Sequence, residues 1–260
     1  MSEVLGLDIG SSYTKAVLVS EGGAFKACAV VKTGMDFALA CRRAVRRCAG
    51  AASGAGDLRV FSTGVGRAAC PSARAQTTEI TCLARGSFAH FPKPHTVVDI
   101  GGQDNKVVRV DACGRVASFK MNRKCAAGTG AFLEEIARRL DVPVSRMSRL
   151  AASADSTVEI GSYCTVFTCT EIIHHVREGR KAAAILRGCY DSVVRRILEI
   201  DALEGDVVLS GGVAANHPVV AELFQERLPK PPIVPERPQW VGALGAALLG
   251  IGKSGGGTIG

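Results

Sequence analysis

Apolar and polar positions along this chain follow two different spacings, one typical of strands and one typical of helices. Residues 3–9 and 14–19 are apolar and β-branched around a Gly-Ser-Ser turn, a pattern that predicts a β-hairpin. Residues 95–111 predict a second hairpin in the same way. In residues 128–140, apolar side chains recur at helical spacing, which predicts an amphipathic helix.

Strand and helix segments alternate through the rest of the chain. A short strand is expected at 59–66, and a buried strand that enters a glycine turn is expected at 206–216. Further helices are expected at 35–49, at 169–200 (one or two helices) and at 241–250. This alternation predicts the α/β fold class.

An internal repeat relates the two predicted hairpins. The segment LDIGSSYTKAVLV at 7–19 matches VDIGGQDNKVVRV at 98–110, with aspartate, isoleucine, glycine, lysine and two valines at equal offsets. Two similar strand–turn–strand units, each followed by helices, predict two related α/β halves. Ligands of such folds bind in the cleft between the halves.

The turns of both hairpins carry residues suited to phosphate. An apolar strand ends at Asp8 or Asp99, and small residues follow, which let backbone N–H groups approach an anion. The two aspartates are expected to hold Mg²⁺ through water molecules. Lys15 is expected to neutralise phosphate charge and Gln103 to orient an attacking water. The predicted phosphate-binding residues are Ser11, Ser12, Tyr13, Thr14, Lys15, Gly101, Gly102 and Gln103.

A third glycine-rich element, SGGVAAN at 210–216, has the pattern of an adenosine pocket. Gly211 and Gly212 would let a flat purine pack on the backbone, and Asn216 could form a hydrogen bond with it. One such hairpin alone is typical of an ordinary turn. Two matched hairpins with this third element favour nucleotide binding.

Composition excludes several classes of protein. The chain has 260 residues, 47% of them apolar and 22% charged, as in globular proteins with a sizeable core. No apolar run approaches the about 20 residues that span a bilayer, and the first residues lack the basic region of a signal peptide. A cytoplasmic location without membrane binding is therefore expected. Thiols stay reduced there, so the ten cysteines are not expected to form a disulfide framework.

The net charge of +8 could help the chain to dock on an acidic partner. The one local basic cluster, CRRAVRRC at 41–48, contains no aromatic residue, whereas single-stranded nucleic acid is usually bound by aromatic and basic side chains together. The cluster is therefore expected to form the exposed face of an amphipathic helix. No nucleic-acid partner is predicted.

Several motifs together resemble one protein family. The chain is similar to the ATP-dependent activators of 2-hydroxyacyl-CoA dehydratases, which are related to the ATPase subunits of benzoyl-CoA reductase. These proteins belong to the superfamily of actin, sugar kinases and heat-shock ATPases. The resemblance covers residues 4–250 and rests on TEITCLARG (78–86), DIGGQD (99–104), KCAAGTGAFLE (124–134), CTVF (164–167) and SGGVAAN (210–216).

The resemblance implies a fold of two related ribonuclease-H-like halves with an interdomain nucleotide cleft. The first half is expected to contain residues 1–94 and 239–252. The second half is expected to contain 95–238, with the adenosine turn and the helices that lead from the cluster cysteines. Residues 253–260 are expected to form a flexible tail.

The resemblance also implies a homodimer that shares one [4Fe–4S] cluster, held by Cys125 and Cys164 of each chain. Such a cluster needs four thiolates, and the chain contains no CxxC motif. Each cysteine precedes a predicted helix, whose positive end favours the negative cluster. Glu134 is expected, by the resemblance, to reach the nucleotide.

The activity implied is ATP hydrolysis with Mg²⁺ coupled to electron transfer. Ferredoxin or flavodoxin would supply a low-potential electron, which the activator passes to a 2-hydroxyacyl-CoA dehydratase or a related acyl-CoA reductase. One alternative is a small-molecule kinase of the same superfamily without a cluster, with Asp99 or Asp104 as its base. Another is a regulator that binds ATP without iron. Neither alternative requires the two cysteines.

The other cysteines and the histidines have ordinary packing explanations. The roles of Cys82 and Cys169 are not assigned. Cys169 lies close enough to Cys164 in sequence to approach the cluster. His174 and His175 lack a metal-binding spacing, since adjacent helical residues point in different directions. Small buried or partly exposed side chains are expected for Cys28, Cys41, Cys48, Cys70, Cys113 and Cys189.

Overall fold

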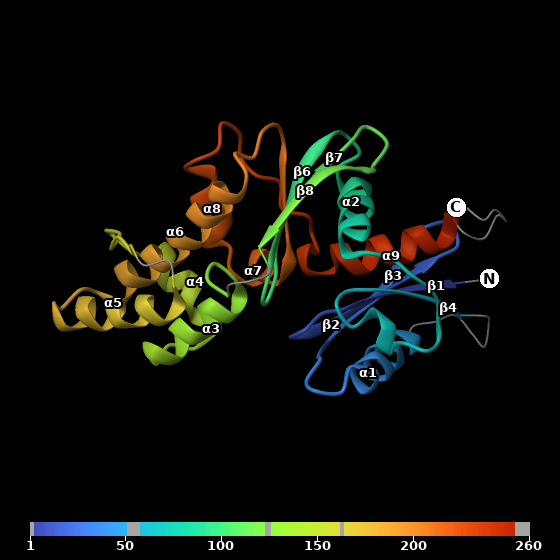
Figure 1. Cartoon of the computed structure of the whole chain (residues 1–260), viewed down its shortest axis with the longest axis horizontal. Coiled ribbons are helices and arrows are strands. Elements are labelled where there is room, and N and C mark those ends of the chain that lie inside the picture. Colours follow the sequence, from blue (N-terminus) through green and yellow to red (C-terminus); the bar gives the residue numbers. More distant parts are fainter. Residues whose placement is uncertain (1–2, 51–57, 123–125, 162–163, 253–260) are drawn as a thin grey trace. The chain divides into compact units, whose positions relative to one another are not determined.

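The computed structural model describes residues 3–50, 58–122, 126–161 and 164–252. The chain divides into two compact units, here named unit 1 and unit 2 (Figure 1). Unit 1 comprises Met1–Pro94, Val108–Ser118 and Gln239–Gly260, and unit 2 comprises His95–Val107 and Phe119–Pro238.

The sheet of unit 1 has the strand order β3-β2-β1-β4-β5. Strand β1 is antiparallel to β2 and parallel to β4, and β2 is antiparallel to β3. The buried residues of β1 place it inside the sheet, as its continuous apolar sequence requires. The strands are β1 (Glu3–Ile9), β2 (Tyr13–Ser20), β3 (Phe25–Lys32), β4 (Leu58–Thr63) and β5 (Ala73–Gln76).

Helix α1 (Phe37–Ala49) covers one face of this sheet. Asp36 begins the helix, because its Oδ1 accepts a hydrogen bond from the backbone N–H of Leu39 at 2.8 Å. Buried residues of α1, among them Cys41 and Cys48, join the apolar cluster of the strands. The helix expected at 35–49 is confirmed.

Helix α9 (Val241–Gly252) packs on the opposite face of the sheet. A Cβ on Gly6 of β1 would lie 2.0 Å from the carbonyl oxygen of Ala243, so only glycine allows this approach. Helix α2 (Glu79–His90) contacts α9 just as closely, since a Cβ on Gly245 would lie 1.8 Å from the carbonyl oxygen of Cys82. The small residues of the last helix are therefore a packing requirement.

A second sheet has the strand order β8-β7-β6-β9. Strand β9 is parallel to β6, with Asp99 opposite Ser210, just as β4 is parallel to β1 with Asp8 opposite Thr63. Both predicted hairpins are thus present, and each is completed by a parallel strand. The strands are β6 (His95–Ile100), β7 (Asn105–Val110), β8 (Val116–Asn122) and β9 (Val207–Ser210).

The core of unit 2 is a large apolar cluster centred on α6 (Ala182–Ile200), which buries Tyr190 completely. Packing among helices stabilises this unit, with α6 in contact with α4, α5 and α8. The other helices are α3 (Gly130–Arg139), α4 (Val144–Ala152), α5 (Thr165–Arg177), α7 (Gly211–Asn216) and α8 (Val219–Gln225).

The structure refines the elements expected from the sequence. The segment 169–200 is two helices, and they are separated near Gly179, whose φ is +74°. The glycine turn expected after β9 is instead the start of the short helix α7. Strands β3, β5 and β8 were not expected. Strand β5 has only four residues, and β3 and β8 are largely exposed or half-buried.

None of the helices within the described ranges is both long and apolar enough to cross a membrane. Short 3₁₀ helices complete the described structure. They lie at Arg67–Ala69 and at Pro238–Trp240.

Candidate functional site

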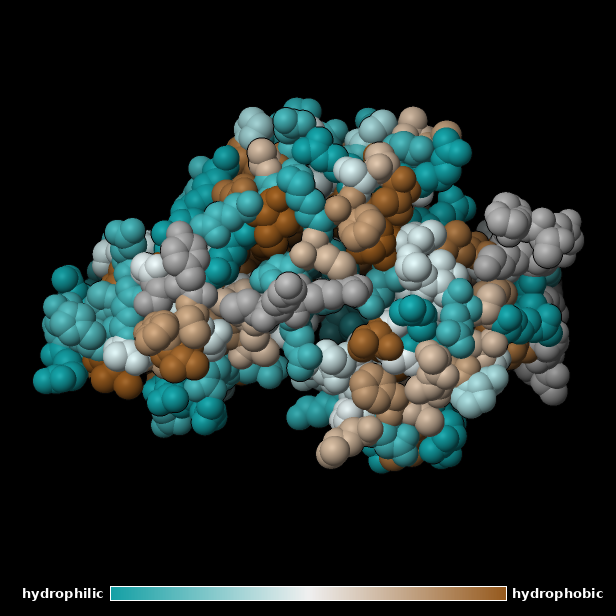
Figure 2. Space-filling view, viewed as in Figure 1, coloured by the Kyte–Doolittle hydropathy of each residue, from teal (hydrophilic) through white to brown (hydrophobic). Residues whose placement is uncertain are grey.

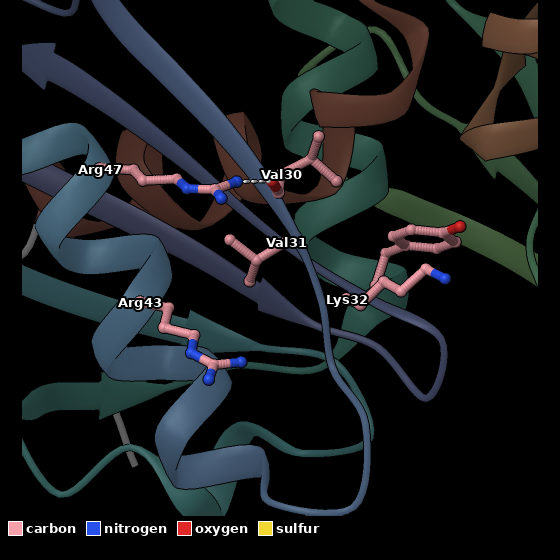
Figure 3. Close-up of a pocket in the computed structure, with 6 residues that line it drawn as sticks. Val30, Val31, Lys32, Arg43 and Arg47 are labelled. Carbon is pink, nitrogen blue, oxygen red and sulfur yellow. Dashed lines mark hydrogen bonds between the residues drawn. The ribbon is translucent and has the colours of Figure 1, made fainter.

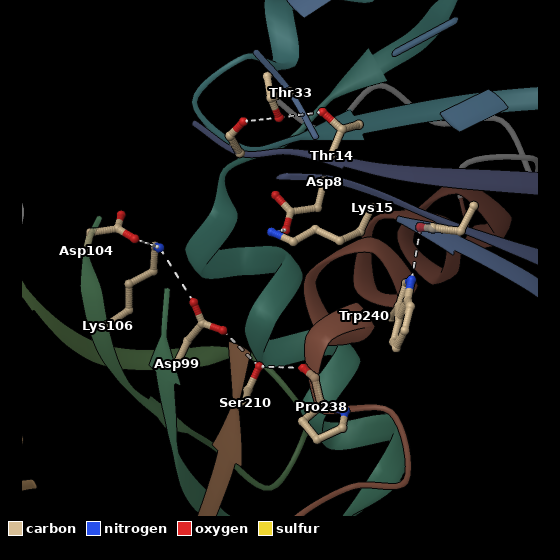
Figure 4. Close-up of polar contacts among 12 residues, drawn as sticks. Asp8, Thr14, Lys15, Thr33, Asp99, Asp104, Lys106, Ser210, Pro238 and Trp240 are labelled. Carbon is tan, nitrogen blue, oxygen red and sulfur yellow. Dashed lines mark hydrogen bonds and ion pairs between the residues drawn. The ribbon is translucent and has the colours of Figure 1, made fainter. Parts of the chain in front are cut away.

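The first hairpin holds an acid beside a base. Asp8, near the end of β1, lies opposite Lys15 of β2, and the Lys15 Nζ is 3.0 Å from the Asp8 Oδ2 (Figure 4). Both side chains are about a fifth exposed, 18% for the lysine and 19% for the aspartate. At a turn of small residues, a carboxylate can bind a cation while the neighbouring ammonium group binds an anion.

The turn between β1 and β2 is held by a short hydrogen-bond network. The Thr33 hydroxyl donates to the carbonyl oxygen of Gly10 at 2.8 Å and lies 3.0 Å from the hydroxyl of Thr14. The Thr33 backbone N–H donates to the carbonyl oxygen of Ser12 at 3.0 Å. Thr14 is fully buried, so its hydroxyl supports the turn from inside, while Ser11 and Ser12 stay partly exposed.

The second hairpin repeats the acid and the base in a more buried form. Lys106 occupies the repeat position of Lys15, and its Nζ lies 2.8 Å from the Asp104 Oδ1 and 3.6 Å from the Asp99 Oδ2. The other oxygen of Asp99 accepts a hydrogen bond from the Ser210 hydroxyl at 2.9 Å (Figure 4). Sequence reasoning did not select Lys106, although the aligned lysine of the repeat was the signal that could have found it.

A glycine with positive φ forms the same corner in each unit. Gly64 follows β4 with φ +92°, and Gly211 follows β9 with φ +97°. A Cβ on Gly64 would lie 2.4 Å from the carbonyl oxygen of Ile9, and a Cβ on Gly211 would lie 2.4 Å from that of Ile100. The repeat therefore extends beyond the hairpins to the parallel strand that follows each one.

The second turn is hydrogen-bonded to the start of α3. The backbone N–H of Gly130 donates to the carbonyl oxygen of Gly101 at 2.9 Å, and that of Ala131 donates to Gly102 at 2.8 Å. Asn105, at the start of β7, donates from its Nδ2 to the carbonyl oxygen of Gly128 at 2.9 Å. The predicted phosphate turn and the first turn of α3 are thus joined directly.

The remaining predicted nucleotide residues are accessible. Gln103 is exposed at the second turn, and Glu134 is exposed on α3. Asn216 is exposed on α7, where its Nδ2 donates to the carbonyl oxygen of Gly212 at 2.8 Å. A ligand can therefore reach these side chains.

Cys164 lies at the N-cap of α5, half-buried and without a disulfide. Its predicted partner Cys125 lies outside the described residues. Cys169 is buried in the core of unit 2, with its Sγ 3.9 Å from the Glu135 Oε1 of α3, and burial raises the pKa of this thiol. Within the described ranges, no group of three or more His, Cys, Asp or Glu side chains is arranged to hold a metal.

Most of the other cysteines are packed as expected. Cys28 is partly buried, and Cys113 differs from the expectation because it is exposed in the turn between β7 and β8. A turn presents its side chains to solvent, so Cys113 has no core to join. The buried thiols are Cys41, Cys48, Cys70, Cys82 and Cys189.

Comparison with known proteins identifies the family. The family model described as the BadF/BadG/BcrA/BcrD ATPase family matches residues 5–250. The chain belongs to this family. It is 37% identical over 254 residues to the 2-hydroxyisocaproyl-CoA dehydratase activator of Clostridioides difficile, covering 96% of this chain and 95% of the relative. It is 39% identical over 248 residues to the activator of lactoyl-CoA dehydratase of Anaerotignum propionicum, covering 94% and 95%.

Solved structures of this ATPase family and beyond it share the fold. The activator of the 2-hydroxyisocaproyl-CoA dehydratase from Clostridium difficile, with bound ADPNP, superposes with a TM-score of 0.89 at 35% identity over 99% of both chains. A ROK family glucokinase from Streptomyces griseus, in complex with glucose and AMPPNP, gives 0.56 at 14% identity over 95% of this chain and 98% of the kinase. The predicted actin and sugar-kinase fold class is confirmed.

Proposed function

We propose that this ATPase is an activator that passes a low-potential electron from ferredoxin or flavodoxin to a 2-hydroxyacyl-CoA dehydratase or a related acyl-CoA reductase. The observation that carries the proposal is the direct hydrogen bonding between the predicted phosphate turn and α3, the helix that follows Cys125. A change in the bound nucleotide at that turn would reach the start of α3, shortly after Cys125 in sequence, through these hydrogen bonds.

Both hairpins are proposed to bind the phosphates of one nucleotide. Asp8 and Asp99 would hold the waters of Mg²⁺, since each carboxylate lies near the end of its strand and is partly exposed. The exposed Gln103 would orient the attacking water, and Glu134 would contact the nucleotide. The other proposed contacts are Ser11, Ser12, Tyr13, Thr14, Lys15, Gly101 and Gly102 for the phosphates and Gly211, Gly212 and Asn216 for adenosine.

Of the two proposed cluster cysteines, Cys164 lies within the described residues, and its position suits a cluster ligand. Cys164 is a half-buried thiol without a disulfide at a helix N-terminus, where the positive end of the helix favours a negatively charged cluster. Cys125 and Cys164 of two copies of the chain would hold one [4Fe–4S] cluster, which supplies one-electron transfer when bound. The domain division at 94/95 and 238/239 is part of the same proposal.

Exposed apolar residues at the start of α5 support a protein contact beside Cys164. Val166 is 71% exposed and Phe167 is 67% exposed. Figure 2 shows apolar residues among hydrophilic ones over the region of α5, at the left of the view. An apolar patch beside the thiol is suited to burial against a second copy of the chain.

ATP and ADP differ in the γ-phosphate. A ligand group shifts the populations of two protein conformations only if it makes different contacts in each of them. In this proposal, Gly102 senses that group through its N–H, because the N–H of Gly101 already donates to the carbonyl oxygen of Asp104. The carbonyl oxygens of Gly101 and Gly102 pass the change to α3. The same turn therefore binds phosphate and positions the helix.

The test is the iron and sulfide content of anaerobically purified protein, together with its native mass. We expect roughly two iron atoms per chain in a dimer. Cys125→Ser and Cys164→Ser should abolish iron binding, while Cys113→Ser, an exposed cysteine outside the site, should retain it. A protein without iron after anaerobic reconstitution would contradict the proposal, and a kinase substrate screen would follow.

A further inference from the structure

A pocket of about 460 Å³ lies at the outer edge of the unit 1 sheet, beside α1 (Figure 3). Its lining contains cations and no carboxylate. The lining residues are Tyr13, Val30, Val31, Lys32, Arg43 and Arg47. The basic cluster noted in the sequence thus contributes two of its four arginines to one pocket.

The pocket adjoins an open sheet edge. Strand β3 is the outermost strand of its sheet, so among the described strands only β2 pairs with it. The Arg47 Nη1 donates to the carbonyl oxygen of Val30 at 2.8 Å, so this carbonyl faces outward, and an added strand would take the place of the Arg47 guanidinium there (Figure 3). Backbone groups on such an edge can pair with a further strand.

The cations flank both faces of this edge. Val31 packs in the cluster that contains α1, whereas Cys28 packs against the cluster that contains α9. Successive strand residues alternate between faces, so Lys32 lies on the α9 face. Arg43 and Arg47 belong to α1 on the other face. A strand added at the edge would direct alternate side chains toward these two sets of cations.

Two of the cations have no partner to neutralise them. Lys32 and Arg43 are exposed, and neither side chain forms a hydrogen bond or an ion pair with any residue in the part of the chain that the structure describes. Arg43 and Arg47 are four positions apart on one helix, where like charges repel. Acidic groups bound in the pocket would remove that repulsion.

We propose that the open edge of β3 binds an extended acidic segment of a partner protein. The segment pairs with β3, its acidic side chains on one face reach Arg43 and Arg47, and those on the other face reach Lys32. The net charge of +8 favours the approach of such a partner. This site needs neither nucleotide nor cluster. Tyr13 lines the pocket and is also one of the proposed phosphate contacts, so the test rests on Lys32 and Arg43, which are not.

Basic residues on an edge strand also protect proteins against unwanted strand addition. The experiment separates the two roles with labelled peptides and the full-length protein at low salt. The first peptide alternates glutamate and valine, the second alternates lysine and valine, and the third carries the same acidic charge on a Glu-Gly-Pro repeat that cannot form a strand. We expect fluorescence anisotropy to rise with the first peptide alone.

Charge-reversed variants locate the site. Arg43→Glu and Lys32→Glu should each weaken binding of the Glu-Val peptide by about tenfold or more, since an attraction becomes a repulsion. Arg42→Glu is the matched control, because Arg42 is exposed on the same helix but does not line the pocket. It should stay within about twofold of the unchanged protein. ATP hydrolysis should be the same in all of them.

Hydrogen exchange supplies the structural readout. Binding of the Glu-Val peptide should slow the exchange of β3 backbone amides, which simple charge attraction would not do. Equal binding of the Glu-Gly-Pro peptide, equal weakening by Arg42→Glu, or no binding of any acidic peptide would each overturn the proposal. The last result would leave edge protection as the role of these cations.

Discussion

The aspartate–lysine pair is the smallest feature that both hairpins share. In the first pair both side chains are partly exposed, whereas in the second the Lys106 side chain is 5% exposed between Asp99 and Asp104. Burial makes the loss of one partner of such a pair more costly in free energy, because water cannot solvate the charge that remains. Lys106 therefore maintains the shape of the second turn, and Lys15 is freer to meet a ligand.

Lys106→Met should lower the free energy of unfolding by about 3 kcal/mol, because two carboxylates lose their common buried cation. Urea unfolding measures the loss. Lys181→Met is the matched control: Lys181 pairs with Asp155, and the two side chains are 73% and 66% exposed, so its loss should be much smaller. Equal losses in the two variants would show that Lys106 has no special structural role.

Burial lowers the pKa of His217 to about 4, and its Nδ1 lies 2.7 Å from the buried hydroxyl of Tyr190. The unfolded chain takes up a proton below pH ~6.5, whereas the folded chain resists it. Stability should therefore fall between about pH 6.5 and 4, by up to about 3 kcal/mol from this group. His217→Gln should flatten the slope, and the exposed His174→Gln should not. Identical slopes in all three proteins would contradict the assignment.

At the scale of elements, each unit has a glycine corner directly after the parallel strand that completes its hairpin. Gly64 and Gly211 both have positive φ and lie against the end of the first hairpin strand. In unit 2 the corner leads directly into α7, so the predicted adenosine element begins at a position only glycine can occupy. The backbone, more than any side chain, defines this part of the site.

Gly211→Ala should cost about 3 kcal/mol or more, because strain at positive φ adds to a clash with the carbonyl oxygen of Ile100. Gly205→Ala isolates the first effect, since Gly205 has φ +81° and open space around it. Its cost should be about 1 kcal/mol. Thermal unfolding of both variants tests the difference, and equal costs would mean that the corner relaxes.

On the scale of the whole molecule, the internal repeat places the same arrangement of strands in both units. Both units contain a hairpin with an aspartate, a lysine and a following parallel strand. Unit 2 alone links its hairpin turn to α3, the helix after Cys125. Both copies thus have the same strand–turn–strand plan, and in unit 2 the turn is also hydrogen-bonded to the start of α3.

If both hairpins bind one nucleotide, Mg²⁺ and a non-hydrolysable ATP analogue should stabilise the protein by about 2.7 kcal/mol at a hundred times Kd. Asp8→Asn and Asp99→Asn should each remove most of this gain. Gln103→Ala should keep it while hydrolysis falls about 100-fold. Asp111→Asn, in an exposed turn, is the control. An effect of only one aspartate would assign the nucleotide to one hairpin.

The sequence by itself determined the α/β class, both hairpins, the repeat and the family, because these depend on local periodicity and short motifs. Tertiary structure alone decided which charges meet. Lys106 contacts Asp99 through the pairing of β6 and β7, and Gly101 contacts Gly130 across a distance in sequence that no local pattern spans. The pocket at β3 likewise needs strand order, since α1 and β3 become neighbours only when the sheet forms.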